Sequence, residues 1–169
     1  MSDAKRYDVA VLGGGPGGYA AALRAALRGA HVCCIEQHKL GGTCLNVGCI
    51  PAKALLHAAE MLHGVGTFER FGLAADNPRY DGPALMRRVR GVADKLRKGV
   101  GQLLQGRKVD VIRGHGRLAG PGRLEVETAD GTQSVQAKSI ILATGSRPAW
   151  PGFLPAGCDR LFTTDQACV

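Results

Sequence analysis

The sequence is poor in aromatic residues and has no long apolar run. Aromatic side chains make up 5% of the 169 residues, and no stretch approaches the roughly 18 apolar residues that suggest a membrane-spanning helix. The 6 cysteines are too few for the disulfide scaffold of a small secreted domain. A strand-like run begins already at Tyr7, which leaves no room for a secretion signal or a transit peptide. We therefore expect a soluble cytoplasmic protein with one core and no membrane partner.

The charge of the chain is one-sided, because 22 lysines and arginines face 14 acidic residues and give a net charge of +8. Many of the basic residues lie in one segment whose apolar residues recur at helical spacing. The apolar residues are Leu85, Val89, Val92, Leu96, Val100 and Leu103, and the basic residues are Arg87, Arg88, Arg90, Lys95, Arg97 and Lys98. A nucleic-acid surface is the other interpretation, but no aromatic residues are interleaved for stacking and no nucleic-acid motif is present. We predict a solvated amphipathic helix and no nucleic-acid partner.

The N-terminal part of the chain has the pattern of a βαβ unit. Tyr7–Gly13 and His31–Glu36 are short apolar runs, and the alanine-rich segment Pro16–Arg28 between them has proline near its start. A strand, a glycine turn, a helix and a second strand in this order predict a parallel sheet.

The rest of the chain alternates irregular, helical and strand-like segments. We expect an irregular stretch at 40–48, a helix at 51–63, a strand at 109–112, a hairpin at 124–138 and a buried strand at 139–145. The hairpin should turn at Asp130–Gly131. A glycine pattern at Gly114–Ala119 also follows a strand, but the Gly-Pro-Gly after it cannot begin a helix, so we predict a turn there.

The residues Gly13–Gly18 fit the pattern G-x-G-x-x-G directly after a strand and at the start of a helix. Gly13 permits a tight turn, Gly15 lets the backbone approach a pyrophosphate, and Gly18 lets the helix and strand pack closely. Glu36 ends the second strand, where a carboxylate can accept hydrogen bonds from an adenosine ribose and repels a 2′-phosphate. A merely structural glycine turn is the alternative. The motif predicts dinucleotide binding but does not separate FAD from NAD.

Two cysteines lie five positions apart in the glycine-rich segment after this unit. Cys44 and Cys49 can close a small disulfide ring, and Cys49 stands at the start of a helix with Pro51 in its first turn. A helix N-terminus would stabilise a thiolate at Cys49. The alternatives are two buried free cysteines, or a metal site that recruits His38, His57 or His63. The spacings fit no familiar zinc pattern.

The whole stretch Gly41–Lys53 resembles the active-site signature of the class I flavoprotein disulfide reductases, the pyridine nucleotide-disulfide oxidoreductases. Its version here, with Lys53-Ala-Leu-Leu-His after it, is most similar to the dihydrolipoamide dehydrogenase subfamily, although Ala52 stands where that subfamily usually has serine. The resemblance runs from about Tyr7 to the C-terminus. It includes Ala143–Pro148, which matches the family's Ala-Thr-Gly motif.

The resemblance implies an α/β fold, namely a Rossmann-like FAD-binding domain with a parallel sheet, crossover helices and a small antiparallel β-meander. Residues 1–147 would form this domain with its redox-active disulfide. Residues 148–169, which contain three prolines, would connect it to a second, NAD-binding domain that this chain lacks. Relative to the family, the chain is therefore expected to be incomplete.

The resemblance also assigns roles to single residues. Cys49 would lie against the flavin as the charge-transfer thiol, Cys44 would exchange with the substrate disulfide, and Lys53 would tune the flavin. Glu36 would hold the adenosine ribose. The residues expected to bind the cofactor are Gly13, Gly15, Pro16, Gly17, Gly18, Glu36, Gly42, Thr43, Lys53, Gly116, Ala143, Thr144, Gly145 and Ser146. Cys33 and Cys34 are read as core residues, whereas Cys158 and Cys168 match nothing in the family.

The implied reaction passes electrons from dihydrolipoamide to the Cys44–Cys49 disulfide, then to FAD and then to NAD. The implied partners are dihydrolipoamide or a lipoyl-bearing protein, and a second copy of the complete enzyme. Mercuric reductase, glutathione reductase and a non-catalytic FAD-binding fragment are the alternatives. Because the acid-base histidine of the family lies in a C-terminal domain that is not present, we expect the 169 residues alone to be inactive.

Overall fold

The computed structural model describes residues 5–155 and 157–167, which form two compact units. The first unit lies within Met1–Cys44 and Arg97–Arg147, and the second within Leu45–Leu96 and Pro148–Val169. The first unit contains the glycine motif, and the second contains the helix that follows the cysteine segment.

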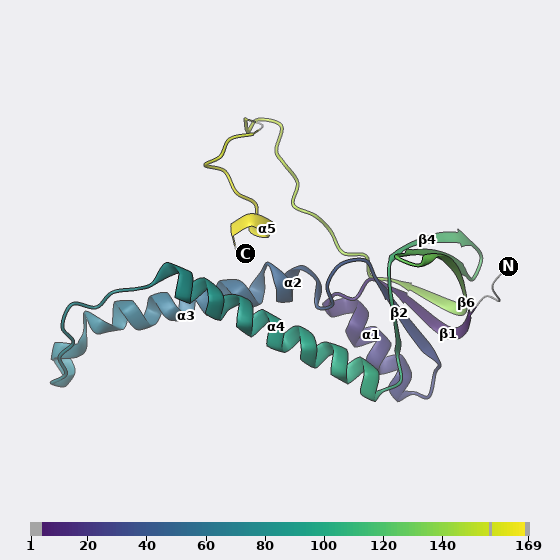
Figure 1. Ribbon diagram of the computed structural model, residues 1–169, viewed down its shortest axis with the longest axis horizontal. Helices are drawn as coiled ribbons and strands as arrows, with labels where there is room; N and C mark the ends of the chain where they lie inside the picture. Colours follow the sequence, from purple (N-terminus) through teal and green to yellow (C-terminus); the bar gives the residue numbers. More distant parts are fainter. Residues whose placement is uncertain (1–4, 156, 168–169) are drawn as a thin grey trace. The chain divides into compact units, whose positions relative to one another are not determined.

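A six-stranded sheet with the order β3-β2-β1-β6-β5-β4 forms the first unit (Figure 1). The strands are β1 (Lys5–Leu12), β2 (Val32–Glu36), β3 (Asp110–Arg113), β4 (His115–Gly120), β5 (Arg123–Thr128) and β6 (Gly131–Leu142). The strands β3, β2, β1 and β6 are parallel, whereas β6, β5 and β4 form an antiparallel meander. Helix α1 (Pro16–Leu27) packs mainly against β1 and β2. The predicted α/β fold with a parallel sheet and a small meander is confirmed.

Strand β6 corrects two expectations, because the second hairpin strand and the final strand are one continuous strand. Its first half, Gly131–Gln136, pairs antiparallel with β5, while Val135–Leu142 pairs parallel with β1. The end of β6 is also not buried, since Ile141 is 36% and Leu142 is 60% exposed. The reason is that α1 lies mainly over β1 and β2 and leaves the end of β6 open.

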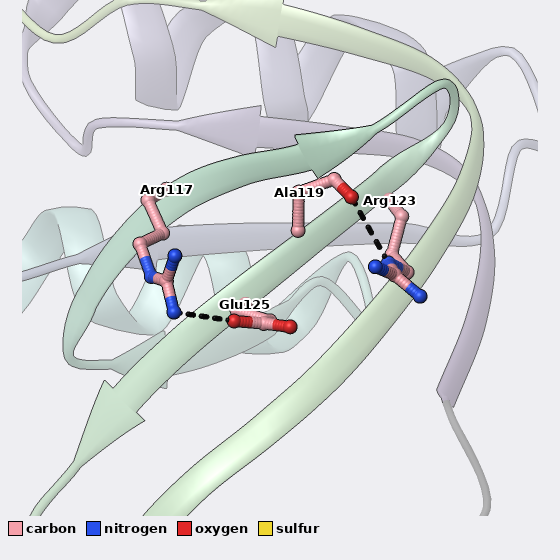
Figure 2. A network of polar contacts seen from close by, with 4 residues as sticks. All are labelled: Arg117, Ala119, Arg123 and Glu125. Atoms are coloured by element: carbon pink, nitrogen blue, oxygen red, sulfur yellow. Dashed lines mark hydrogen bonds and ion pairs between the residues drawn. The ribbon is translucent and has the colours of Figure 1, made fainter.

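Strand β4 stands where the sequence predicted a turn, so that expectation is wrong. The segment pairs antiparallel with β5, with Gly116 opposite Val126, and has a bulge between Leu118 and Gly120. An ion pair between Arg117 and Glu125, 2.6 Å apart, joins the two strands (Figure 2). The sheet curls until β4 contacts β2, although three strands separate them in the sheet order. Pairing partners far along the chain thus made a strand of a segment whose local signals favour a turn.

The main core of the first unit lies inside this curl. It consists of Tyr7, Ala10, Leu12, Cys33, Ile35, Ile112, Leu124, Val126 and Val135. Cys33 and Cys34 are both fully buried in β2, which agrees with their prediction as core residues. Burial, the main cause, raises the pKa of each thiol to about 12. These two thiols are therefore packing groups rather than nucleophiles.

The second unit contains helix α3 (Cys49–Val65), the short 3-10 helix η1 (Phe68–Phe71), the first part of α4 (Gly82–Gly106) and α5 (Thr164–Ala167). Helix α4 is the predicted amphipathic helix, but its buried stripe is Val89, Ala93, Val100 and Leu104. Leu96 and Leu103, which were expected on the buried face, are 42% and 58% exposed. The 3.6-residue period rotates the stripe away from them over the length of the helix. Across the described ranges, no helix is both long and apolar enough to span a bilayer.

Candidate dinucleotide and disulfide site

The glycine loop connects β1 to α1 and is compact at two positions. Gly13 has φ +106°, a conformation that other residues rarely adopt, and its N–H donates to the carbonyl of Ile35 (2.8 Å). A Cβ atom at Gly13 would overlap the carbonyl of Ala143, and one at Gly18 would overlap the carbonyl of Gly13. Only glycine at both positions allows the turn and the close approach of helix to strand.

The start of α1 is open where a phosphate would approach. No side chain caps the helix, its first turn carries no acidic residue, and Pro16 at its start has no N–H. A Cβ at Gly17 would meet nothing within 4 Å, and one at Gly15 would meet only the Cα of Gly42, at 3.6 Å. The amides at this N-terminus thus lack a side-chain acceptor and lie beside free space. Helix amides and the helix dipole favour an anionic phosphate at such a position.

Glu36 lies at the carboxyl end of β2 and is buried, with 8% of its surface exposed. Its Oε2 accepts a hydrogen bond from the N–H of Gly14 (2.7 Å), and its Oε1 accepts one from the N–H of His38 (2.7 Å). Both bonds hold the carboxylate at the edge of the glycine loop. A carboxylate offers about four lone-pair positions, so two remain to accept hydroxyl donors such as those of a ribose.

Two further segments of the first unit meet the glycine loop. The N–H of Gly41 donates to the carbonyl of Gly14 (2.8 Å), and Gly42, with φ +58°, would place a Cβ only 2.8 Å from the Cα of Gly15. After β6, the N–H of Ala143 donates to the carbonyl of Leu12 (2.8 Å). The loop, Glu36, the Gly41–Gly42 turn and Ala143 therefore converge at the carboxyl ends of β1, β2 and β6. In α/β sheets this edge is where ligands bind.

The other predicted cofactor residues in this unit are placed as follows. Thr43, Thr144, Gly145 and Ser146 are exposed in the segments that lead away from this edge. Gly116 on β4 packs toward the core, since a Cβ there would lie 2.5 Å from a side-chain atom of Leu12. Packing alone therefore explains why position 116 is glycine, and its role beside an adenine stays a prediction.

Cys44 and Cys49 are joined in a disulfide. Cys44 lies in the short helix α2 (Gly42–Asn46) and is half-buried, whereas Cys49 is the first residue of α3 and is exposed. Cys33, Cys34 and Cys158 are free, while Cys168 lies outside the described residues. The disulfide excludes the alternative of two free cysteines. Within residues 5–155 and 157–167, no cluster of histidine, cysteine and acidic residues could hold a metal ion.

Lys53 is exposed in the first part of α3, four residues after Cys49. Residues four apart on a helix share one face, so Lys53 and Cys49 are neighbours along α3.

Three residues of the dinucleotide edge were missed by sequence reasoning. Gly14 and His38 donate backbone N–H groups to Glu36, and Gly41 ties its turn to the loop. All three act through the main chain. Only the glycine content of the two turns could have pointed to Gly14 and Gly41, and no signal in the sequence points to His38.

Comparison with known proteins decides the family. Residues 7–168 match the model of the family described as pyridine nucleotide-disulphide oxidoreductase. The chain belongs to this family. Its members are flavoprotein oxidoreductases that act on disulfides, which agrees with the disulfide and the Rossmann-like sheet described above.

Dihydrolipoyl dehydrogenases are among the most similar relatives. The chain is 47% identical to the enzyme of Zymomonas mobilis over 145 residues, which cover 85% of this chain and 31% of the relative. It is 40% identical to that of Bacillus subtilis over 173 residues, covering 97% of this chain and 36% of the relative. The chain thus spans about a third of the length of these relatives.

A solved structure supports the fold. The HOCl-induced flavoprotein disulfide reductase RclA of Escherichia coli, determined as a Cu(II) complex, superimposes with a TM-score of 0.74 at 27% sequence identity. The match covers 88% of this chain and 30% of that chain.

Proposed function

We propose that this chain is the FAD-binding part of a dihydrolipoyl dehydrogenase, which passes electrons from dihydrolipoamide through the Cys44–Cys49 disulfide and FAD to NAD. The disulfide at the start of α3, directly after the dinucleotide edge in the sequence, is the observation that carries this proposal. Residues 1–147 are the FAD-binding domain, and residues 148–169 are the connection to an NAD-binding domain.

The residues at the dinucleotide edge fit FAD. The uncapped N-terminus of α1 suits the pyrophosphate, and Glu36 has free lone pairs for the adenosine ribose. By their match to the family signature, Thr43, Lys53 and Ala143–Ser146 would approach the rest of the cofactor. When bound, FAD supplies reversible two-electron chemistry between a dithiol and a nicotinamide.

The two cysteines carry the exchange with the substrate. A thiolate of dihydrolipoamide attacks the Sγ of Cys44, the bond between Cys44 and Cys49 breaks, and Cys49 leaves as a thiolate. The second substrate thiol then attacks the mixed disulfide, which releases oxidised lipoamide and leaves Cys44 reduced. The protein pair gains the two electrons that the substrate loses. The N-terminus of α3 stabilises the Cys49 thiolate and so makes Cys49 the better leaving group.

The proposed partners follow from this reaction. A lipoyl-bearing protein delivers the dithiol. By resemblance to the family, and not from the reaction, we also propose that the complete enzyme acts as a homodimer in the cytoplasm. Mercuric and glutathione reductase are less well supported, because the relatives at 40–49% identity are dihydrolipoyl dehydrogenases. A non-catalytic FAD-binding fragment is the remaining alternative, since the chain spans about a third of those relatives.

The test compares the 169-residue chain, which we expect to be inactive, with the longest natural polypeptide that contains it. We expect the longer polypeptide to be yellow and to reduce NAD with dihydrolipoamide, and Cys44→Ser to abolish turnover. The matched control is Cys158→Ser, because Cys158 is a free, half-buried cysteine outside the dinucleotide edge. A polypeptide that binds NAD but cannot be reconstituted with FAD would contradict the cofactor. Reduction of oxidised glutathione by a reduced nicotinamide, without turnover of dihydrolipoamide, would contradict the substrate.

A further inference from the structure

A concave surface lies near the amino ends of β1 and β5 and beside the middle of β6, within the first unit. This shallow hollow is open to solvent, offers about 790 Å³ of space, and is lined by Arg6, Arg123, Gln136, Lys138 and the turn that joins β4 to β5. Because Arg6 stands near the beginning of β1 and the glycine loop follows its end, about 20 Å of strand separates this surface from the dinucleotide edge. The surface is therefore distinct from the site proposed for FAD.

The strand register brings its basic residues together. Gln136 on β6 pairs with Arg6 on β1 and with Arg123 on β5, so three adjacent strands present Arg6, Gln136 and Arg123 in one row. All three are exposed, and Lys138 follows on the same strand. Cα atoms two strands apart are about 10 Å from each other. Arg6 and Arg123 therefore stand on the two strands that flank Gln136.

The charge of this row is poorly compensated. Lys138 pairs with Asp8 at 2.7 Å, whereas neither Arg6 nor Arg123 makes an ion pair with another described residue. Arg117 on the neighbouring strand differs, because Glu125 neutralises it (Figure 2). Within the part of the chain that the structure describes, Arg6 and Arg123 therefore contribute two positive charges to the concave surface without an ion-pair partner.

Arg123 is also held in place. Its Nε donates to the carbonyl of Ala119 at 3.2 Å, across the turn between β4 and β5 (Figure 2). This bond uses the inner nitrogen of the guanidinium group and leaves the two terminal nitrogens to form a fork for an oxyanion. A guanidinium group that is already anchored loses less conformational entropy when it binds.

We propose that the row of Arg6, Gln136, Arg123 and Lys138 binds an extended acidic segment of a protein partner. Carboxylates two residues apart in an extended segment lie about 7 Å from each other, and long arginine side chains that start about 10 Å apart can each reach one of them. The amide of Gln136 between the two arginines can donate to and accept from a peptide group. A single small anion would be too short to contact all the side chains of this row at once.

The test measures binding of a fluorescent peptide, four Glu-Thr repeats, to the 169-residue chain by anisotropy at low salt. We expect Arg6→Gln with Arg123→Gln to weaken binding about tenfold or more, since two charge-assisted contacts are lost. The matched control is Arg87→Gln with Arg88→Gln, which removes the same charge from exposed positions of α4. We expect that control to change binding less than about twofold. Thermal unfolding of both double variants checks that they fold.

Amide shifts in heteronuclear spectra should place the peptide at Arg6, Arg123 and Gln136. Equal weakening by the two double variants would overturn the proposal, because attraction to the net charge alone would then explain binding. No binding by the unaltered chain would overturn it as well. Displacement of the peptide by inorganic phosphate at equal charge would show that the ligand is a small anion and not an acidic segment. Tighter binding of an oligothymidylate that needs the same two arginines would show that the ligand is a nucleic acid. None of these results depends on FAD or on turnover.

Discussion

At the scale of single residues, the cysteines of this chain differ by environment rather than by type. Cys33 and Cys34 are buried thiols, Cys44 and Cys49 share a disulfide, and Cys158 is free and half-buried. Reactivity of a thiol requires both access and a thiolate. Burial removes both from Cys33 and Cys34, since their pKa values rise to about 12.

Maleimide labelling near neutral pH should separate these classes in a Cys168→Ser variant. In the folded, oxidised chain we expect only Cys158 to react. Reduction should expose Cys44 and Cys49, and unfolding should expose Cys33 and Cys34. Peptide mapping by mass spectrometry after each step gives the result. Labelling of Cys33 or Cys34 in the folded chain would contradict their burial, and a link from Cys44 to any cysteine other than Cys49 would contradict the disulfide.

Asp8 gives a pH-dependent prediction. The ion pair with Lys138, followed by the N–H of His31, lowers the pKa of Asp8 in the folded protein. A lowered folded pKa stabilises the fold above the unfolded value of about 4, and this contribution is lost as the pH falls through the folded value. Asp8→Asn should therefore lower the urea midpoint at neutral pH, and the difference should vanish in acid.

The exposed Asp76→Asn is the control for this measurement, since it removes the same charge from a loop position. Its midpoint should follow that of the unaltered chain at every pH. A difference between Asp8→Asn and the unaltered chain that persists, or grows, below the folded pKa would show that charge at Asp8 is not the cause.

At the scale of elements, the junction of β1 and α1 depends on which glycine is altered. Gly17 and Gly18 are consecutive helical residues, but only Gly18 faces the turn, where a Cβ would overlap the carbonyl of Gly13. At Gly17 a Cβ would meet nothing within 4 Å. The two positions form a matched pair for testing how closely the helix approaches the strand.

Gly18→Ala should lower the free energy of unfolding by about 1–3 kcal/mol, because the overlap forces the helix away from β1. Gly17→Ala should leave it unchanged or raise it by up to about 1 kcal/mol, because alanine is the better helix former. Urea unfolding of the purified variants measures both. Equal losses in the two variants would mean that backbone freedom, rather than packing, explains the second half of the glycine motif.

At the scale of the whole molecule, the first unit is assembled from distant parts of the sequence. Strand β6 pairs with β1 from Lys5–Val135 to Leu12–Leu142, so residues near both ends of the unit lie side by side. Residues after Arg147 belong to the second unit. The first unit should therefore tolerate the loss of the tail and not the loss of β6.

Two truncations test this. A chain that ends at Arg147 should keep its cooperative unfolding transition and the Cys44–Cys49 disulfide, because β6 is complete at Leu142. A chain that ends at Ser139 should lose the transition, because the pairing of the last three residues of β6 with β1 and the bond from Ala143 to Leu12 are gone. Circular dichroism and thiol titration measure both. Equal stability of the two truncated chains would contradict the boundary at 147.

Local signals in the sequence were sufficient for the βαβ unit, the glycine loop and the cysteine pair. A helix start, a tight glycine turn and an acidic strand end are each set by neighbouring residues. The helix that begins at Pro16 and the strand that ends at Glu36 could therefore be placed before any tertiary contact was known. The disulfide was predicted from the long motif that surrounds the two cysteines. Their spacing alone was also compatible with two free cysteines.

Tertiary structure decided the features that depend on pairing between distant segments. β4 is a strand because β5 offers it hydrogen bonds, and β6 is one strand because β1 and β5 share it. Register alone brings Arg6 and Arg123 to opposite sides of Gln136. Only folding delivers the amide of Gly14 to Glu36, which lies 22 residues further along the chain. Such contacts join residues far apart in the chain, and their energies depend on packing and register, which local propensity does not contain.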